Sequence, residues 1–139
     1  MKYLLDSVVW LWSIGTVEKI NKDGREIFDS RDSEIYFSAA SAWELSIKAR
    51  LGKLNLPSPP ERCVPEFMAK QRLLPLPVTH LHALKVYDLS PHHQDPFDRL
   101  LIAQAMVEKM IVLTADRIFR KYPVEILWCG RKTRFETPL

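Results

Sequence analysis

The sequence predicts an α/β fold, a three-layer α/β/α sandwich with a mostly parallel central sheet. Short apolar segments alternate with helical patterns along the whole chain, which is typical of strands joined by crossover helices. Of the 139 residues, 47% are hydrophobic and 27% are charged, a composition that favours a globular domain over disorder. The length corresponds to about one domain, so residues 1–139 are expected to form a single domain.

Five short apolar segments are expected to be strands. Residues 2–5 form the first, and residues 35–37 are a β-branched and aromatic triplet. Residues 74–78 contain prolines, which restrict this strand to a short length or to an edge of the sheet. Residues 110–113 are wholly apolar, as expected of a buried strand, and residues 124–128 form the last.

Helices are expected between the strands, and their ends carry capping residues. The clearest spans residues 38–51, with a serine at its start and Gly52 just beyond its end. Asp95 and Pro96 open a long helix that runs to about residue 109, with aspartate as the N-cap. The other expected helices are one through Trp10 and Trp12 that ends at Gly15, one each over residues 20–29, 62–72 and 79–86, and a short one from Asp116.

Several classes of protein are excluded by composition. No stretch of 18 apolar residues exists, so no membrane-spanning helix is expected, and the N-terminus does not resemble a signal peptide. Cys63 and Cys129 form no C-x-x-C pair, which argues against a disulfide framework or a zinc knuckle and favours a reducing cytoplasm. The glycine-rich phosphate loops and the G-x-S-x-G motif of serine hydrolases are missing.

The net charge of +3 is unevenly distributed along the chain. Residues 117–139 contain six basic and two acidic side chains, whereas the preceding 116 residues have a slight acidic excess. The six basic residues are Arg117, Arg120, Lys121, Arg131, Lys132 and Arg134. Such a patch suits a polyanionic partner, and the alternative is a solvated tail.

Four acidic residues occur where the predicted elements meet. Asp6 follows the first strand, Glu44 lies in the helix after the second, Asp98 is in the first turn of the long helix, and Asp116 follows the fourth strand. Because the carboxyl ends of parallel strands share one edge of a sheet, these side chains are expected to meet there. Their mutual repulsion calls for a hard divalent cation, so Mg²⁺ is expected, with Mn²⁺ as an option.

Structural alternatives exist for three of these acids. Asp6 and Asp116 can each cap a helix or form an Asx turn. Asp95 is expected to be the N-cap of the long helix, and Asp98 behind it can simply favour the helix dipole. Asp98 shares a helix face with apolar residues, so we expect it on the inner side and as the metal ligand. Those residues are Leu101, Ile102 and Ala105.

Glu44 differs from the other three because its helical neighbours are apolar. They are expected to form a buried stripe, next to which a carboxylate needs a partner or a metal. The stripe consists of Ala40, Trp43, Ile47 and Leu51. The alternative is an exposed ion pair between Glu44 and Lys48, four residues later.

Four motifs together resemble a known family. They are Tyr-Leu-Leu-Asp-Ser at residues 3–7, Ser-Ala-Ala-Ser-Ala-Trp-Glu-Leu at 38–45, Asp-Pro-Phe-Asp-Arg-Leu-Leu-Ile-Ala-Gln-Ala at 95–105, and Leu-Thr-Ala-Asp at 113–116. In this order and spacing they resemble the PIN-domain ribonucleases, and most closely the VapC-like toxins of type II toxin–antitoxin systems. The resemblance places the acidic site at Asp6, Glu44, Asp98 and Asp116, with Thr114 as the accompanying hydroxyl. Ser7 and Val8 stand where many relatives have threonine and histidine, so the hydroxyl is kept and the imidazole is not.

The resemblance implies a metal-dependent endoribonuclease that hydrolyses RNA phosphodiester bonds and leaves a 5′-phosphate. Asp6, Asp98 and Asp116 would hold the cation, with Glu44 as a further ligand or base. The basic residues Arg99, Arg117, Arg120 and Lys121 would bind the RNA backbone. The implied partners are a cognate antitoxin that blocks the acidic cleft, a second copy of the chain in a homodimer, and a structured RNA such as tRNA.

Other functions stay open at this point. The first is a non-catalytic PIN-like module that binds RNA or a partner and uses its acids only as caps. The second is a receiver-like phosphotransferase, which is disfavoured because no second aspartate adjoins Asp6 and no lysine follows Thr114 and Ala115. His92 and His93 with Asp95 resemble part of a zinc site, but adjacent loop histidines point apart, so a loop role or contact with RNA phosphate is expected.

Overall fold

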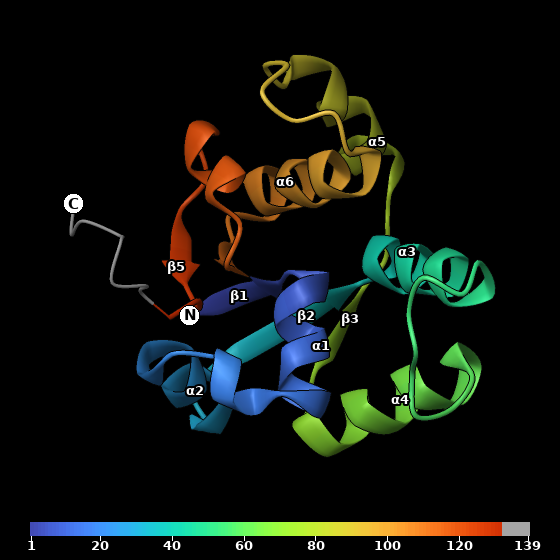
Figure 1. Cartoon of the computed structure of the whole chain (residues 1–139). Helices are drawn as coiled ribbons and strands as arrows, with labels where there is room; N and C mark the ends of the chain where they lie inside the picture. Colours follow the sequence, from blue (N-terminus) through green and yellow to red (C-terminus); the bar gives the residue numbers. More distant parts are fainter. Residues whose placement is uncertain (132–139) are drawn as a thin grey trace.

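Five short strands form one sheet in which every neighbouring pair is parallel. The computed structural model describes residues 1–131 (Figure 1). The strand order is β3-β2-β1-β4-β5, so the first strand in sequence is the central one. The strands are β1 (Lys2–Leu5), β2 (Glu34–Ser38), β3 (Leu74–Leu76), β4 (Ile111–Thr114) and β5 (Ile126–Trp128). The sheet is therefore fully parallel where a mostly parallel one was predicted, and the proline-containing β3 lies at an edge as expected.

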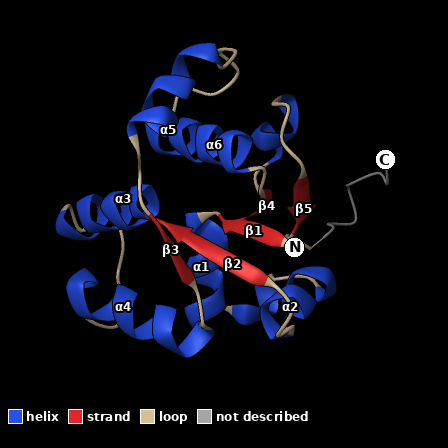
Figure 2. Cartoon of the chain, turned by 180° about the vertical axis from the view of Figure 1, so that it is seen from behind, coloured by secondary structure: helices blue, strands red, loops and turns tan. Residues whose placement is uncertain are grey.

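Side chains of the central strand alternate between two apolar cores. Tyr3 and Leu5 point into one core, and Leu4 points into the other. The first core lies under α1 (Ser7–Gly15), α2 (Lys22–Asp29) and α4 (Pro60–Gln71). The second lies under α6 (Pro96–Glu108), and α5 (His80–Lys85) packs against α6. Figures 1 and 2 show these helices on opposite sides of the sheet, which is the predicted three-layer arrangement.

The remaining elements connect these layers. Helix α3 (Ala39–Arg50) follows β2 and contacts both α4 and α6 (Figure 2). Three short 3-10 helices complete the described chain. They are η1 (Val17–Lys19), η2 (Val86–Asp88) and η3 (Arg117–Lys121).

Most predicted helix ends are confirmed by their caps. The Asp95 carboxylate accepts hydrogen bonds from the backbone N–H groups of Phe97 (2.8 Å) and Asp98 (3.1 Å). Gly52 has a φ of +75°, the left-handed conformation expected just after α3. The local sequence therefore determines where α3 ends and where α6 begins.

Two predicted helices start at other residues in the structure. The second helix starts at Lys22, because the Asn21 side chain caps it and Ile20 before it is fully buried in extended backbone. Helix α4 starts at residue 60 instead of 62, with proline at its first position, and contains Pro65. Strands β3 and β5 are each two residues shorter than predicted. One short element, η1, was not predicted.

The predicted buried stripe of α3 is wrong for three of its four members. Ala40 is buried, but Trp43 and Leu51 are 60% and 62% exposed, and Ile47 is also on the surface. The helix instead turns Glu44 inward, together with Ser41 and Leu45. Helical periodicity correctly groups residues on a face, but the more apolar face is not the inner one here because the inner face carries the glutamate.

Two further expectations concern membranes and thiols. Within residues 1–131 there is no helix whose length and apolar character would let it cross a membrane. Cys63 and Cys129 are both buried free thiols. The basic residues Lys132 and Arg134 lie outside the described residues.

Candidate active site at the edge of the sheet

The candidate site lies where β1 and β4 end side by side. Crossover connections leave β1 on one side and β4 on the other, and in parallel sheets such a point opens a crevice at the carboxyl ends of the strands. The Asp6 backbone N–H donates to the Leu113 carbonyl (3.0 Å), and Thr114 is the last residue of β4. Residues from the two ends of the chain are therefore neighbours here.

Asp6 is buried but does not cap the helix that it precedes. Its side chain is 3% exposed and makes no capping bond to α1. It accepts instead a hydrogen bond from the Thr114 hydroxyl (2.8 Å). Burial, with smaller contributions from the charges of Asp98, Glu44 and Asp116, raises the pKa of Asp6 to about 7, although the Thr114 bond acts in the opposite direction. The capping alternative for Asp6 is thus not what the structure shows.

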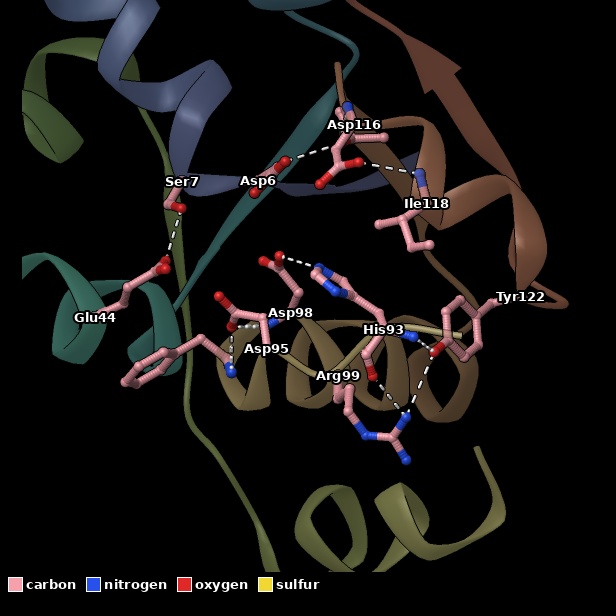
Figure 3. Close-up of polar contacts among 12 residues, drawn as sticks. Asp6, Ser7, Glu44, His93, Asp95, Asp98, Arg99, Asp116, Ile118 and Tyr122 are labelled. Carbon is pink, nitrogen blue, oxygen red and sulfur yellow. Dashed lines mark hydrogen bonds and ion pairs between the residues drawn. The ribbon is translucent and has the colours of Figure 1, made fainter. Parts of the chain in front are cut away.

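Asp98 points from the first turn of α6 toward the same space (Figure 3). Its side chain is 17% exposed, and the apolar residues predicted to share its face, among them Ile102, are buried. Burial raises the pKa of Asp98 to about 6, opposed by a hydrogen bond to His93 and reinforced by the charges of Asp95 and Glu44. Asp95 itself is occupied at the helix end, as predicted.

Asp116 is exposed and does act as a cap. One of its carboxylate oxygens accepts from the Ile118 backbone N–H (3.0 Å) at the start of η3. Its own backbone N–H donates to the Thr114 hydroxyl (3.0 Å), which in turn donates to Asp6. Thr114 therefore links the two carboxylates, and the cap fixes the side chain of Asp116 at the rim of the site.

Glu44 reaches the site from α3 and has a partner on each oxygen. The Ser7 hydroxyl donates to Oε1 (2.8 Å), and the Lys48 ammonium donates to Oε2 (2.9 Å). The Glu44 side chain is 5% exposed and that of Lys48 is 47% exposed, so the pair is not the fully exposed one considered above. The hydrogen bond to Glu44 raises the pKa of Lys48, which stays cationic beside the acidic cluster.

His93 lies in the site, whereas the sequence analysis assigned it a loop role or contact with RNA phosphate. Its Nε2 atom is 2.7 Å from Oδ2 of Asp98. Among the described residues, one ligand atom each from His93, Asp98 and Asp116 lies within 4.8 Å of the other two. Asp6 and Glu44 are outside this tight set, but the charges of Asp98 and Asp116 act on Asp6, and that of Glu44 acts on Asp98. The pattern of two histidines before Asp95 was the signal in the sequence, but no periodicity shows which of two loop histidines points toward the acids.

Arg99 was expected to bind the RNA backbone, but in the structure its guanidinium contacts the protein backbone. Its guanidinium donates to the carbonyls of Ser90 (3.0 Å) and His93 (3.1 Å), and more weakly to those of Val86 and Leu89. It thereby holds the loop that precedes α6, and its contact with RNA stays a prediction.

The other basic candidates follow Asp116 directly, in η3. Lys121 is exposed, and the Arg120 guanidinium lies 4.7 Å from the centre of the Trp128 ring. Arg117 begins the same 3-10 helix and is exposed too. The basic residues therefore lie next to the acidic rim, where a polyanion bound at the site would extend.

The donor set fits a divalent cation. Carboxylates from four segments converge on one space, as Figure 3 shows for Asp6, Asp98 and Asp116, and two of them have pKa values raised by burial and mutual repulsion. A divalent ion bound by oxygen ligands removes that repulsion. The arrangement can therefore hold such an ion beside a surface that is basic.

Comparisons with known proteins agree with this geometry. The family model of the PIN domain matches residues 3–125. Over 65 residues the chain is 43% identical to Ribonuclease VapC16 of Mycobacterium tuberculosis, an alignment covering 47% of this chain and 45% of the relative. The chain thus spans about half the length of that curated relative.

Solved structures resemble the chain over nearly its whole length. A chain of VapBC2 from Rickettsia felis, bound to a DNA fragment from their promoter, has a TM-score of 0.71 at 14% identity and covers 91% of this chain and 98% of its own. DNA-bound VapBC from Salmonella typhimurium has a TM-score of 0.69 at 21% identity and covers 91% and 97%. At these identities the likeness concerns the fold.

Proposed function

The chain belongs to the PIN domain family, and from this premise we propose that it is a metal-dependent endoribonuclease that acts as the toxin of a toxin–antitoxin pair. The relative that aligns with about half of the chain is named a ribonuclease, and the two structural neighbours come from VapBC assemblies. One observation carries the proposal. Asp6 is a buried carboxylate that caps nothing, and its burial, together with the charges of the carboxylates around it, raises its pKa to about 7. A purely structural role would not retain so unfavourable a cluster.

Each residue has a distinct part in the proposed reaction. Asp6, Asp98 and Asp116 hold the cation, which is Mg²⁺ or Mn²⁺. When bound, the cation supplies an activated water and offsets the charge that develops on the scissile phosphate. Thr114 fixes the Asp6 carboxylate through its hydroxyl. Asp95 supports the site indirectly, since it caps the helix that carries Asp98.

Glu44 lies beside the cluster, where it acts as a further metal ligand or as a base. Ser7 and Lys48 each hold one of its oxygens, so the carboxylate is fixed in direction at the side of the cluster. Lys48 also places a positive charge near the space where a phosphate would bind. Arg117, Arg120 and Lys121 in η3 bind the RNA backbone beyond the cleavage point.

The proposed partners are a cognate antitoxin, a second copy of the chain and a structured RNA such as tRNA. Large apolar side chains on α3, α5 and η2 are exposed, which supports docking of protein partners on that side of the molecule. They are Trp43, Leu51, Leu81, Leu84 and Tyr87. An antitoxin segment would inhibit by covering the acidic cluster.

The test is cleavage of total RNA by the purified chain with added metal. Activity should disappear with excess chelator and return with Mg²⁺ or Mn²⁺, leaving products with 5′-phosphates. Asp6→Asn should abolish it, while the matched variant Asp29→Asn, an exposed aspartate at the end of α2, should not. Cleavage that persists in chelator or in Asp6→Asn would exclude the assigned site. RNA binding without any cleavage would instead favour the non-catalytic PIN-like module.

A further inference from the structure

One imidazole, that of His93, lies among the carboxylates of the candidate site. His93 belongs to the loop between η2 and α6, and its ring is 21% exposed. Nε2 contacts Oδ2 of Asp98 at 2.7 Å, and the group that it forms with Asp98 and Asp116 spans no more than 4.8 Å. Figure 3 shows the ring entering the space between the two aspartates.

These separations suit ligands of a single ion. Divalent cations of this size bind oxygen and nitrogen at about 2.1 Å, so atoms that share one ion lie about 3 to 4 Å apart. The His93 and Asp98 ligand atoms, 2.7 Å apart, are close to the shorter of these separations. The three ligand atoms of His93, Asp98 and Asp116 all lie within 4.8 Å of one another, which is only slightly more than the longer one.

The loop holds His93 in place through its backbone. The His93 N–H donates to the Tyr122 hydroxyl (2.8 Å), and its carbonyl accepts from Arg99 (3.1 Å). The same Tyr122 hydroxyl donates to the Ser90 carbonyl (2.9 Å), and Arg99 binds that carbonyl too. His92, by contrast, lies edge-on against the Tyr122 ring with a centroid separation of 5.4 Å. The two neighbouring histidines therefore have different surroundings, and only His93 meets the carboxylates.

We propose that His93 is a nitrogen ligand of the bound cation, and that it makes the site prefer Mn²⁺ to Mg²⁺. The proposal rests on the proposed metal-dependent function. Imidazole is a ligand for transition metals, whereas Mg²⁺ selects oxygen, so a single nitrogen in the set shifts affinity toward Mn²⁺. It also gives His93 a role different from the loop position or phosphate contact expected from the sequence.

The experiment compares His93→Gln with His92→Gln in the full chain. Glutamine can still hydrogen-bond Asp98 through its side-chain amide, so the substitution removes the imidazole while allowing that carboxylate to stay oriented. Binding of Mn²⁺ and of Mg²⁺ is measured by calorimetry, and pulsed EPR of the Mn²⁺-loaded protein detects directly bound nitrogen. Wild type and His92→Gln should show nitrogen coupling, and His93→Gln should not. Mn²⁺ affinity should fall at least about tenfold in His93→Gln, with Mg²⁺ affinity changed much less.

A second measurement does not depend on the variant folding. Labelling histidine with ¹⁵N in the wild-type chain should convert the ¹⁴N coupling into the ¹⁵N pattern. Absence of nitrogen coupling in the wild type, or its persistence in His93→Gln, overturns the proposal. Equal losses for both ions also overturn it, because His93 would then only orient Asp98. Nitrogen coupling in a chain that cleaves no RNA would leave this inference standing and remove the nuclease function.

Discussion

Helix α6 carries two buried polar clusters with opposite electrostatics. Toward its C-terminal end, Gln104 accepts from Ser38, donates to the Pro77 carbonyl and meets Nδ1 of His82. Nε2 of His82 then contacts Glu108 at 2.7 Å. In this cluster donors match acceptors. At the N-terminal end of the same helix, Asp98 lies near Asp6 and other acids, and the pKa values of Asp6 and Asp98 are raised by burial and by the charges of neighbouring carboxylates.

The difference indicates what each cluster is for. A buried network with all its hydrogen bonds made stabilises one arrangement of α3, α5 and α6. A cluster of like charges lowers the stability of the fold and persists only if something else selects it. The first region therefore positions the helix, and the second is the one that the proposed reaction would use.

The largest expected effect comes from removing one charge from the acidic cluster. Asp98→Asn should reduce RNA cleavage by orders of magnitude while the fold survives, because it removes a metal ligand. The matched change is Asp95→Ser, which keeps the cap and should keep most of the activity. Both variants are compared in one Mg²⁺ titration of cleavage rate. An inactive Asp95→Ser with a normal melting curve and an active Asp98→Asn would transfer the ligand role to Asp95.

The pH dependence of stability should reveal the cost of burying Asp6 among other carboxylates. Folding raises the pKa of Asp6 from its ordinary value near 4 to about 7, so the unfolded chain releases this proton first. Without metal, the free energy of unfolding should therefore fall as pH rises from about 4 to about 7, by up to about 4 kcal/mol from Asp6, and then level off.

Two comparisons isolate the contribution of Asp6 to that fall. Asp6→Asn should lose the part of the fall that Asp6 contributes, keep the part from Asp98, whose pKa is raised to about 6, and be at least as stable as wild type at pH 7. Saturating Mg²⁺ should stabilise the wild type and flatten its profile, because only the folded chain binds the ion. Urea unfolding at a series of pH values measures both. A loss of several kcal/mol in Asp6→Asn at neutral pH would instead make Asp6 a structural residue.

Disrupting the hydrogen-bonded network of Gln104, His82 and Glu108 should lower the free energy of unfolding and leave RNA cleavage unchanged. His82→Ala removes a side chain that is 1% exposed and strands the partners of both ring nitrogens, with an expected loss of about 2–4 kcal/mol. His80→Ala, at an exposed position in the same helix, should change stability by less than about 0.5 kcal/mol. Chemical denaturation gives both values. Equal small effects would show that the network does not hold α5 and α6 together.

The smallest predicted effect concerns Asp95, the N-cap of α6. Asp95→Ala leaves the N–H groups of Phe97 and Asp98 without their acceptor and should lower stability by about 1 kcal/mol. Asp95→Ser should restore most of it. Thermal melts of the two variants provide the measurement, and equal melting temperatures for Ala and Ser would contradict the capping role.

Elements with local signals could be predicted well from the sequence. Asp95 and Pro96 predict the start of α6, Gly52 predicts the end of α3, and the apolar run before Asp6 predicts the central strand, because each depends on residues next to it. The orientation of α3 could not be predicted in this way. Exposure of Trp43 depends on what the opposite face must contact, and that contact is made by residues far away in sequence.

The same distinction applies to the candidate site. Strand ends brought Asp6, Asp98 and Asp116 to one edge by a general rule of parallel sheets. The roles of Ser7 and Lys48 in holding Glu44 depend on side-chain directions that spacing alone does not give. The contacts of His93, and those that Arg99 of α6 makes with the loop before that helix, were unpredictable for a similar reason, since a loop without regular structure has no periodicity from which contacts can be inferred.

The hydrogen bond between Thr114 and Asp6 joins residues 108 positions apart, and this separation has a consequence for synthesis of the chain. During translation, β1 leaves the ribosome early but lacks its neighbour β4 until residues beyond 114 have emerged. Long-range pairings of this kind form late, because the intervening chain must be closed first. The acidic cluster is therefore completed only after residues beyond 116 have emerged, and a growing chain that already carries β1 lacks the complete cluster until then.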